Sequence, residues 1–591
     1  MDRVSLNADD AVGGVALTSI PRDYNAAHDL LQRNLQAGRA DQVAFVDDRT
    51  SITYGELARR VDRFALGLHS IGVGREDRIV LCLNDTIDWP TIFLGAIKAG
   101  VVPVCVNTGL SKHDYDYILR DSRAKALFVS RAAFAPFDGL HNSIPTLQRL
   151  LISEAPLADG GDIGAILDAA GDDDRFDAVD TSSDEPCFWL YSAGSQGHPR
   201  ATVHCHASLV QMAELYGLRM LGLTARDRCF SAARLYSSYG LCNSLIFPMV
   251  AGAMAVLKAT PPTVPELITY LTGRAPAKVV GARPTVFFGM PALYAGLLAE
   301  PDCPESGDLS LRLCVSAGEA MPDGLRQRVE ERFEVELLNG ISATEMLHIF
   351  LSTPRSEGRT DPAGLPVPGF RLRLVDDQDQ DVPDGEVGTL LVNGPTAALG
   401  YWNQREQTRD VFLGRWVRTG DRFWRDAEGY YHYVGRCDDL LKISGQFVSP
   451  AEVAAELAAH EEVAEAAVIG VPDAEGGFIR PKALIVLKPG VIPDASTEAR
   501  LMAHLRDNLA HFKLPSWIEF VEQLPAAQDR SCEARAVSPD LPPDTMIPLA
   551  PLNLLDAVLR EAEESRQGPN AGDSIEAPRG QGVGRPPAQG T

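Results

Sequence analysis

Short apolar runs alternate with amphipathic segments over most of the chain. The apolar runs at 78–83, 126–129, 278–281 and 311–315 are typical of buried strands, and stretches with helical periodicity lie between them. Residues 52–68 show the smallest unit of this pattern, because a strand-like start leads through a turn into an apolar-periodic segment. Strands that alternate with helices in this way predict a layered α/β body.

The pattern changes in the second half of the chain. Near 372–376 and 388–393, short strands are separated by Asp-Asp and Pro-Asp-Gly turns, which predicts a small β-subdomain. From Asp439 the pattern predicts a compact α+β unit, with a helix at 450–460 and strands after it. The fold class expected is therefore α/β, with a large N-terminal part and a small C-terminal α+β part.

Beyond about residue 540 the composition shifts. Residues 553–567 carry apolar positions at helical spacing, and Asn553 is a suitable helix cap. We expect this helix to dock on its own domain, with a partner-binding helix as the alternative. The remainder is rich in Gly, Pro and Ser, and we expect it to be disordered.

Length, charge and cysteine usage narrow the class of protein. A chain of 591 residues is too long for one core, so two or more domains are expected. A formal net charge of −25 argues against nucleic acid and anionic membrane as partners. The ten cysteines contain no Cys-x-x-Cys pair, and the longest apolar stretch, 93–106, is too short to span a bilayer. Because the N-terminus lacks a signal-peptide apolar region, we expect a cytoplasmic enzyme.

A Ser/Gly-rich loop follows the apolar run 187–190 and reads Tyr-Ser-Ala-Gly-Ser-Gln-Gly-His-Pro-Arg from Tyr191 to Arg200. Such a loop after a strand presents backbone N–H groups and hydroxyls to phosphate oxygens. The candidate phosphate-binding residues are Ser192, Gly194, Ser195, Gln196, Gly197 and Arg200.

Further motifs extend along the chain. They are the Asn-Gly-Ile-Ser-Ala-Thr-Glu segment at 339–345, Thr-Gly-Asp at 419–421, Tyr-Val-Gly-Arg-Cys-Asp-Asp at 433–439 and Leu-Leu-Lys-Ile-Ser-Gly at 440–445. Together with the loop, they resemble the adenylate-forming superfamily of acyl-CoA ligases over about residues 20–540. The segments 233–245 and 284–291 resemble its benzoate-CoA ligase branch.

The resemblance implies a domain organisation. An AMP-binding domain would span 1–437 and a mobile lid domain 438–540, with a hinge at Asp438, followed by the extension at 541–591. It also implies the ligands: a carboxylic acid or its adenylate, the AMP moiety of that adenylate or ATP, CoA, and Mg²⁺ if adenylation is retained.

By the same resemblance, Thr344 would contact the α-phosphate and Glu345 would hold Mg²⁺. Asp421 would accept hydrogen bonds from the ribose hydroxyls, and Arg436 would contact the nucleotide. Lys442 belongs to the segment that enters for the CoA step.

Gly445 of that segment would leave room for the narrow pantetheine arm. Tyr239, His348 and Ile349 would line the acid pocket. Ser342 replaces a glycine of the family motif and adds a hydroxyl beside the acyl group, so an acid more polar than benzoate, or differently shaped, is expected.

The chain departs from the family pattern at two places that matter for adenylation. In the phosphate loop, Gln196, Arg200 and Ala201 replace threonine, lysine and glycine. Ser531 stands where the family has the lysine that grips carboxylate and phosphate, and no lysine follows Lys513. Loss of one such donor costs on the order of 10²–10³ in rate.

The sequence therefore predicts an enzyme biased to thioesterification, in which acyl-adenylate and CoA give acyl-CoA and AMP. A separate ligase would then supply the adenylate. Two alternatives stay open: a complete ATP-dependent ligase in which Arg200 or Arg530 compensates, and an inactive scaffold that binds an acyl-adenylate or a carboxylate.

Overall fold

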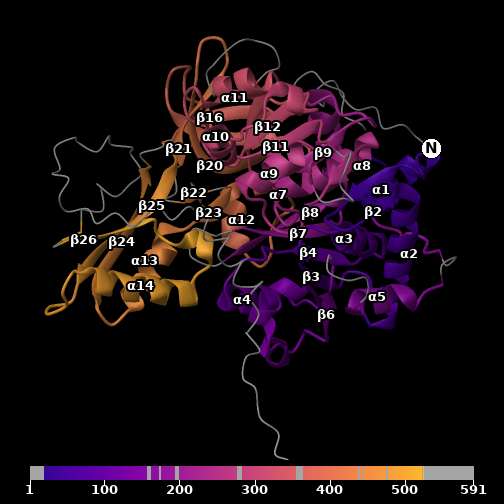
Figure 1. The fold of residues 1–591 in the computed structure, drawn as a ribbon, viewed down its shortest axis with the longest axis horizontal. Coiled ribbons are helices and arrows are strands. Elements are labelled where there is room, and N and C mark those ends of the chain that lie inside the picture. Colours follow the sequence, from indigo (N-terminus) through magenta and orange to yellow (C-terminus); the bar gives the residue numbers. More distant parts are fainter. Residues whose placement is uncertain are drawn as a thin grey trace, which may run out of the picture. The chain divides into compact units, whose positions relative to one another are not determined.

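The computed structural model describes residues 19–155, 161–171, 175–192, 199–275, 283–353, 364–436, 440–443, 445–473, 477–521 and 523–524 (Figure 1). The chain divides into two compact units, Met1–Pro548 and Leu549–Thr591. The second unit lies outside the described residues, as does the helix expected at 553–567, so all the described elements belong to the first unit.

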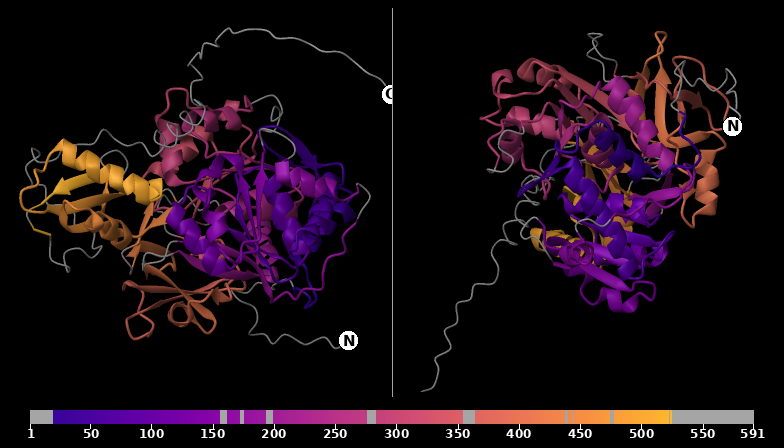
Figure 2. Two further views of the ribbon diagram at one scale, coloured as in Figure 1. Left: turned by 90° about the horizontal axis from the view of Figure 1, so that it is seen from below. Right: turned by 90° about the vertical axis from the view of Figure 1, so that its right-hand side faces the viewer.

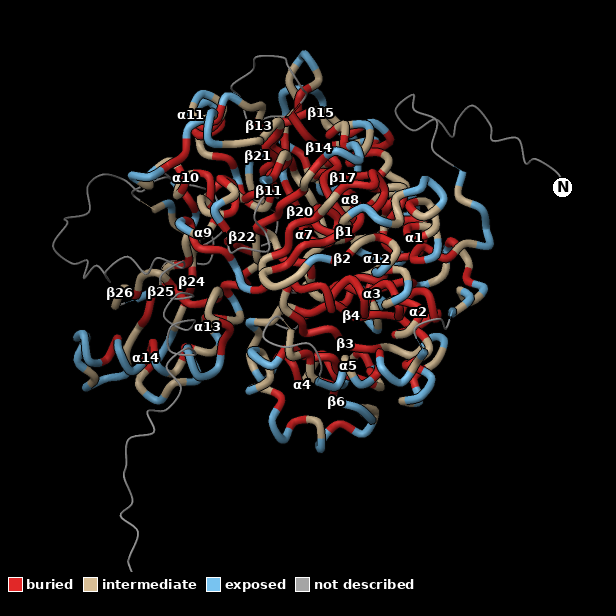
Figure 3. Tube along the Cα trace, turned by 45° about the vertical axis from the view of Figure 1, so that its right-hand side comes forward, coloured by how far each residue is buried: buried red, intermediate tan, exposed pale blue. Residues whose placement is uncertain are grey.

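A seven-stranded sheet forms one layer, in the order β18-β8-β7-β4-β3-β5-β6. Its inner strands pair in parallel because helices connect them, whereas β7 and β8 pair antiparallel. Figure 3 shows β3 and β4 buried along their length, as strands covered on both faces are. The strands are β3 (Arg78–Cys82), β4 (Val102–Cys105), β5 (Ala126–Ser130), β6 (Arg149–Ser153), β7 (Pro186–Ser192), β8 (Arg200–Cys205) and β18 (Gly400–Tyr401).

A nine-stranded sheet forms the second layer, in the order β15-β14-β13-β12-β11-β9-β10-β1-β2. From β13 to β1 all its pairs are parallel, so the carboxyl ends of these strands lie at one edge. The strands are β1 (Val43–Val46), β2 (Ser51–Thr53), β9 (Arg228–Ser231), β10 (Met254–Val256), β11 (Val286–Gly289), β12 (Leu313–Ala317), β13 (Glu336–Ser342), β14 (Ile349–Ser352) and β15 (Leu365–Pro366).

Helices with apolar faces complete these layers. In α2, Thr53 and Glu56 form a capping box that fixes where the helix begins. The α6 and α7 helices continue as π-helical turns, η6 (Ala213–Met220) and η7 (Cys242–Ile246). The helices are α1 (Ala26–Gln36), α2 (Tyr54–Ser70), α3 (Asp88–Lys98), α4 (Lys112–Ser122), α5 (Gly161–Asp168), α6 (His206–Met212), α7 (Ser238–Leu241), α8 (Phe247–Ala251), α9 (Val264–Leu271), α10 (Pro291–Ala299) and α11 (Leu325–Phe333).

A five-stranded antiparallel sheet follows, in the order β16-β17-β20-β19 with β21 on β20. This is the small β-subdomain expected from the turn-rich segment. Its elements are β16 (Arg371–Val375), β17 (Gly388–Asn393), α12 (Arg405–Val411), β19 (Phe412–Leu413), β20 (Trp416–Arg425) and β21 (Tyr431–Arg436).

The last described elements have a hydrophobic core of their own, in which Val453, Leu457 and Ile485 are buried with Leu501 and Leu505. Figure 2 shows them as a group coloured towards yellow. They are β22 (Leu441–Ile443), β23 (Gln446–Val448), α13 (Pro450–Ala459), β24 (Val463–Pro472), β25 (Ile479–Leu487), α14 (Ala495–Asn508), η10 (His511–Lys513) and β26 (Trp517–Phe520).

The expected fold class is confirmed: a large layered α/β part is followed by a small α+β part. Three of the four apolar runs are strands β3, β5 and β12, whereas the run at 278–281 lies outside the described residues. In the described part of the chain, no helix is long and apolar enough to cross a membrane.

Candidate nucleotide and acyl site

The predicted phosphate-contact and metal residues lie where two parallel strands end. β12 and β13 pair up to Ala317 and Gly340, so their carboxyl ends meet at one edge of the sheet, where open α/β sheets bind ligands. A short 3-10 turn, η9 (Thr344–Met346), follows β13 and carries Thr344 and Glu345. The ring of His204 lies 2.8 Å from the carbonyl oxygen of Thr344 through its Nε2 and fixes this turn.

Glu345 is a buried carboxylate with two partners. Its Oε1 accepts a hydrogen bond of 2.5 Å from the hydroxyl of Tyr401 and lies 3.3 Å from Nη2 of Arg200. The Arg200 guanidinium also stacks on the Tyr401 ring, 4.5 Å from its centroid. Burial alone would raise the pKa of Glu345, but Arg200 and the Tyr401 hydroxyl together lower it, so the group is an anion at neutral pH.

Asp421 and Arg436 face each other across β20 and β21, where they are register partners. Nη1 of Arg436 donates to Oδ1 of Asp421 at 2.8 Å, and both side chains are largely buried. The Arg436 guanidinium lies over the ring of Phe447, 5.1 Å from its centroid, and the Lys442 ammonium lies 5.3 Å from the same centroid. Burial lowers the pKa of Lys442, while Asp421 acts against this.

The turn between β22 and β23 lies close to the carboxyl end of β12. Gly445 has a left-handed backbone there, with φ +78°. A Cβ on Gly318, which follows β12, would come within 3.2 Å of Cα of Gly445, so the two backbones touch. The structure thus brings Gly445 and Lys442 to the edge of the sheet that carries Thr344 and Glu345.

The predicted acid-pocket residues form a buried aromatic cluster. The rings of Tyr239 and His348 are 5.2 Å apart between centroids, and the Tyr239 hydroxyl donates to the carbonyl oxygens of Gly289 and Val315. Burial lowers the pKa of His348 to about 3, so its ring is neutral, and its Nε2 lies 3.0 Å from Oδ1 of Asn243.

Ile349 begins β14 and is the register partner of Ser342 on β13. Its side chain fills the space beside Gly340, where a Cβ would come within 2.6 Å of it. Ser342 is half-buried at the end of its strand. Ser342 is thus paired with the residue that follows His348 of the aromatic cluster.

Several predicted residues lie outside the described part of the chain: Gly194, Ser195, Gln196 and Gly197 of the phosphate loop, Asp438 at the expected hinge, and Ser531. Both ends of the phosphate loop are described, because Ser192 closes β7 and pairs with Arg200 on β8. Of these two ends, Arg200 lies beside Glu345, with its Nη2 3.3 Å from Oε1.

Sequence reasoning missed Tyr401. It lies on the edge strand β18, which pairs with β8 next to Arg200, and reaches Glu345 from a position 56 residues later in the chain. No local motif marks a two-residue edge strand, so only the sheet topology could identify it.

The arrangement suits a polar ligand that can form hydrogen bonds. Ser316 and Asn339 are register partners at the carboxyl ends of β12 and β13, and Oγ of Ser316 and Oδ1 of Asn339 are buried without a hydrogen-bond partner. Within the described ranges, no group of three or more His, Cys, Asp or Glu side chains could hold a metal ion. A single carboxylate, Glu345, fits Mg²⁺ that takes its remaining ligands from phosphate and water.

Comparison with known proteins gives the family. A model described as AMP-binding enzyme matches residues 31–402, and one described as AMP-binding enzyme C-terminal domain matches 452–529. The chain is 47% identical to a benzoate–CoA ligase of Thauera aromatica, covering 86% of this chain and 94% of the relative. It is 41% identical to a 4-hydroxybenzoate–CoA/benzoate–CoA ligase of Rhodopseudomonas palustris, covering 85% and 92%.

Comparison with solved structures leads to the same family. A benzoate CoA ligase from Burkholderia xenovorans LB400 is 42% identical, with a TM-score of 0.66 and coverage of 86% of this chain and 98% of that one. The anthranilate CoA ligase AuaEII in complex with anthranoyl-AMP is 35% identical, with a TM-score of 0.66 and coverage of 86% and 96%. The chain belongs to the AMP-binding enzyme family, in its acyl/aryl-CoA ligase group. This confirms the resemblance and the cofactor set expected from it.

Proposed function

We propose that the chain forms an aromatic acyl-CoA thioester from the acyl-adenylate and CoA, and that its own adenylation step is impaired. The observation that carries this proposal is that Ser531 stands where the family has a lysine, and that no lysine follows Lys513 in the sequence. Full adenylation and thioesterification are standard in this family, so the proposal concerns a loss in one of two half-reactions.

Lys513 does not take the place of the absent lysine, because it is already paired with two carboxylates. Its Nζ lies 2.6 Å from Oε1 of Glu452 and 3.5 Å from Oδ2 of Asp114, and only 4% of its side chain is exposed. Two carboxylates thus neutralise the last lysine of the chain, and moving it would separate buried opposite charges.

The substrate class follows from the relatives and from the pocket. Relatives named for benzoate, 4-hydroxybenzoate and anthranilate point to a single-ring aromatic acid. The pocket residues Tyr239 and His348 offer an aromatic wall with neutral polar atoms, and Ser342 adds a hydroxyl. We propose benzoate or a small polar derivative of it.

For the nucleotide, we propose Asp421 as the acceptor of ribose hydroxyl bonds and Arg436 as its orienting partner at 2.8 Å. Thr344 and the phosphate loop would contact the α-phosphate. Magnesium, when bound, would be held by Glu345 and would neutralise charge on the departing pyrophosphate. Arg200 would bring positive charge to the same phosphates, and its distance of 3.3 Å from Glu345 supports this role.

In the thioester step, the CoA thiol loses its proton to solvent and its sulfur bonds to the acyl carbon. The bond from that carbon to the phosphate oxygen of AMP breaks, and AMP leaves with the electron pair. The contact between Gly318 and Gly445 brings the hairpin of β22 and β23 to the site, which supports a role for this hairpin in admitting the thiol arm. This chemistry needs no cation at position 531.

Two assays test the proposal on the full chain. Benzoyl-AMP with CoA should give benzoyl-CoA and AMP at a rate well above the uncatalysed one. Benzoate with ATP and Mg²⁺ should release pyrophosphate on the order of 10²–10³ times more slowly than a ligase with the lysine. Rapid, benzoate-dependent pyrophosphate release would refute the impairment, and no thioester above background would leave a scaffold that only binds adenylate.

A complete ATP-dependent ligase is the second candidate, because Arg200 supplies a cation next to Glu345. If Arg200 compensates for the absent lysine, Arg200→Ala should abolish pyrophosphate release but leave thioester formation from benzoyl-AMP largely intact. If both rates fall together, Arg200 acts in nucleotide binding and not as a substitute for the lysine.

A further inference from the structure

The acid pocket depends on a segment without regular secondary structure, residues 232–237, which connects β9 to α7. We propose that the ion pair between Asp85 and Arg234 positions this segment, and with it Tyr239, for binding of the aromatic acid. Asp85 and Arg234 would be positioning residues, since neither belongs to the predicted site. This inference rests on the proposed function for the identity of the ligand.

Asp85 approaches the segment from the other sheet, where it follows β3. Its Oδ1 lies 3.2 Å from Nη2 of Arg234, and its Oδ2 accepts a bond of 3.2 Å from the backbone N–H of Leu235. The side chains of Arg234 and Asp85 are only 8% and 4% exposed. The carboxylate thus binds both the side chain and the backbone of the segment.

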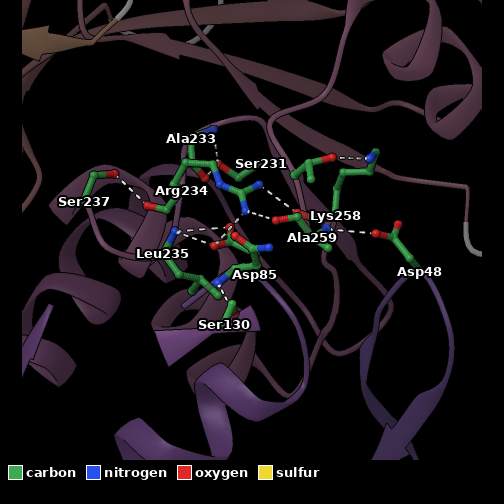
Figure 4. A network of polar contacts seen from close by, with 12 residues as sticks. Asp48, Asp85, Ser130, Ser231, Ala233, Arg234, Leu235, Ser237, Lys258 and Ala259 are labelled. Carbon is green, nitrogen blue, oxygen red and sulfur yellow. Dashed lines mark hydrogen bonds and ion pairs between the residues drawn. The ribbon is translucent and has the colours of Figure 1, made fainter. Parts of the chain in front are cut away.

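Arg234 also binds the residues that follow β10, in addition to Asp85 after β3 (Figure 4). Its guanidinium donates to the carbonyl oxygens of Lys258 at 2.7 Å and Ala259 at 2.5 Å, which follow β10. The N–H of Ala259 donates in turn to Oδ2 of Asp48, after β1, at 2.9 Å. The planar fork of an arginine can satisfy these acceptors together, which a point charge cannot.

The position of residues 232–237 determines the position of Tyr239, because α7 packs on this segment. The hydroxyl of Ser237 donates to the carbonyl oxygen of Arg234 at 2.8 Å and accepts from the N–H of Gly240 at 3.1 Å, as the cap of α7. A Cβ on Gly240 would lie only 2.0 Å from that same carbonyl oxygen. The helix that carries Tyr239 therefore packs directly on the backbone of Arg234.

The network is charged at neutral pH. Burial raises the pKa of Asp85 to about 6, and Arg234 and the N–H of Leu235 keep it from rising further. Loss of either partner leaves a buried charge without compensation. The segment would then shift towards an arrangement that pairs or hydrates the remaining charge.

The expected effect is selective. Tyr239 and His348 belong to the acid cluster, whereas Asp421 and Arg436 lie in the β-subdomain and make none of their described contacts with Arg234. A shift of α7 should therefore weaken binding of the acid and leave binding of AMP unchanged. Misplacement by about 1 Å can cost on the order of 10²-fold in rate.

The test uses the full chain, with benzoate and AMP titrated separately by calorimetry and benzoyl-AMP turned over with CoA. Arg234→Met and Asp85→Asn should raise the dissociation constant of benzoate and the KM for benzoyl-AMP by about tenfold or more, with the AMP constant unchanged. Arg234→Lys keeps the charge opposite Asp85 but loses the planar fork, so its constants should fall between those of Arg234→Met and wild type. Hydrogen exchange at the amides of Leu235 and Leu241 should accelerate in Arg234→Met.

Lys98→Met is the matched control. Lys98 and Asp62 form another buried ion pair, with side chains 6% and 8% exposed, that joins α3 to α2. Its loss should lower thermal stability without changing the ratio of benzoate to AMP affinity. Equal losses of benzoate and AMP binding in Arg234→Met, or unchanged exchange at Leu235 and Leu241, would overturn the positioning role. Inactivity of wild type towards benzoyl-AMP would instead overturn the proposed function.

Discussion

At the scale of single residues, Glu345 has a divided role. Its carboxylate is bound by Arg200 and Tyr401, so a metal ion held there, as we propose, would share an anion that protein groups already neutralise in part. Mg²⁺ prefers carboxylate and phosphate oxygens, and a guanidinium nearby weakens the field that attracts it. Binding of a metal-nucleotide complex should therefore depend on the Glu345 charge more strongly than binding of AMP.

Glu345→Gln tests this dependence, because it keeps the shape of the side chain and removes its charge. The affinity for ATP with Mg²⁺, measured by calorimetry, should fall about tenfold or more, corresponding to loss of a charge-assisted contact of roughly 1.5–3 kcal/mol. The affinity for AMP in EDTA should change little. Tyr401→Phe is the control, since it removes one donor but keeps the Arg200 pair. Equal losses for both nucleotides in Glu345→Gln would show that the carboxylate acts on the nucleotide without the metal.

A second prediction at this scale concerns Ser531. Ser531→Lys puts an ammonium at the position where the family has one, so benzoate-dependent pyrophosphate release should increase, by up to about 10²-fold. Thioester formation from benzoyl-AMP should stay the same, because that step needs no cation there. Ser531→Ala serves as the control and should resemble wild type. An unchanged rate in Ser531→Lys would place the defect in the phosphate loop instead.

At the scale of elements, sequence patterns predicted what is local. The apolar runs gave β3, β5 and β12, and the turn-rich segment gave the β-subdomain, because burial and turn chemistry are encoded within a few residues. The contact of Tyr401 with Glu345 could not be predicted, since it depends on β18 joining the edge of a sheet built from far earlier strands. The same holds for Asp85 and Arg234, which meet only because two sheets place their strand ends together.

The hairpin of β22 and β23 yields a prediction at this scale. Gly445→Ala puts a methyl group on a residue with φ +78°, in the space proposed for the thiol arm, with Cγ of Met290 3.8 Å from the new Cβ. Thioester formation should slow by about tenfold or more, chiefly through a higher KM for CoA, while the AMP dissociation constant stays constant. Stopped assays with benzoyl-AMP at varied CoA concentration measure both parameters.

Gly490→Ala is the matched control for this substitution. Gly490 also has a left-handed backbone, with φ +93°, but a Cβ there would meet nothing within 4 Å. It carries the strain of the substitution, about 1 kcal/mol, without crowding the site. If both variants lower CoA turnover equally, strain in the C-terminal elements accounts for the effect and the hairpin has no direct role.

At the scale of the whole molecule, the two large sheets create the site by placing polar residues at strand ends. Glu345 and Thr344 follow β13, Arg200 begins β8, and Arg234 follows β9. Three buried imidazoles that the fold keeps neutral lie in or next to strands of these sheets: His204 in β8, His206 directly after it and His348 directly before β14. Burial lowers the pKa of His204 and of His206 to about 4, and that of His348 to about 3.

The lowered pKa values of these three histidines predict how the stability of the folded chain depends on pH. Below about pH 6.5 the unfolded chain binds protons on them while the folded chain does not, so stability is fully present above that pH and is lost as the pH falls. At pH 5 each histidine should lower the free energy of unfolding by about 2 kcal/mol. Asp85, whose pKa is raised to about 6 by burial, offsets part of this loss because the folded chain binds its proton more tightly than the unfolded chain. In His206→Gln, whose amide oxygen can still accept from the N–H of Ala26, the fall in thermal midpoint between pH 7.5 and pH 5 should be smaller than in wild type. An identical fall would mean that His206 already takes up its proton in the folded chain, so that burial does not set its pKa.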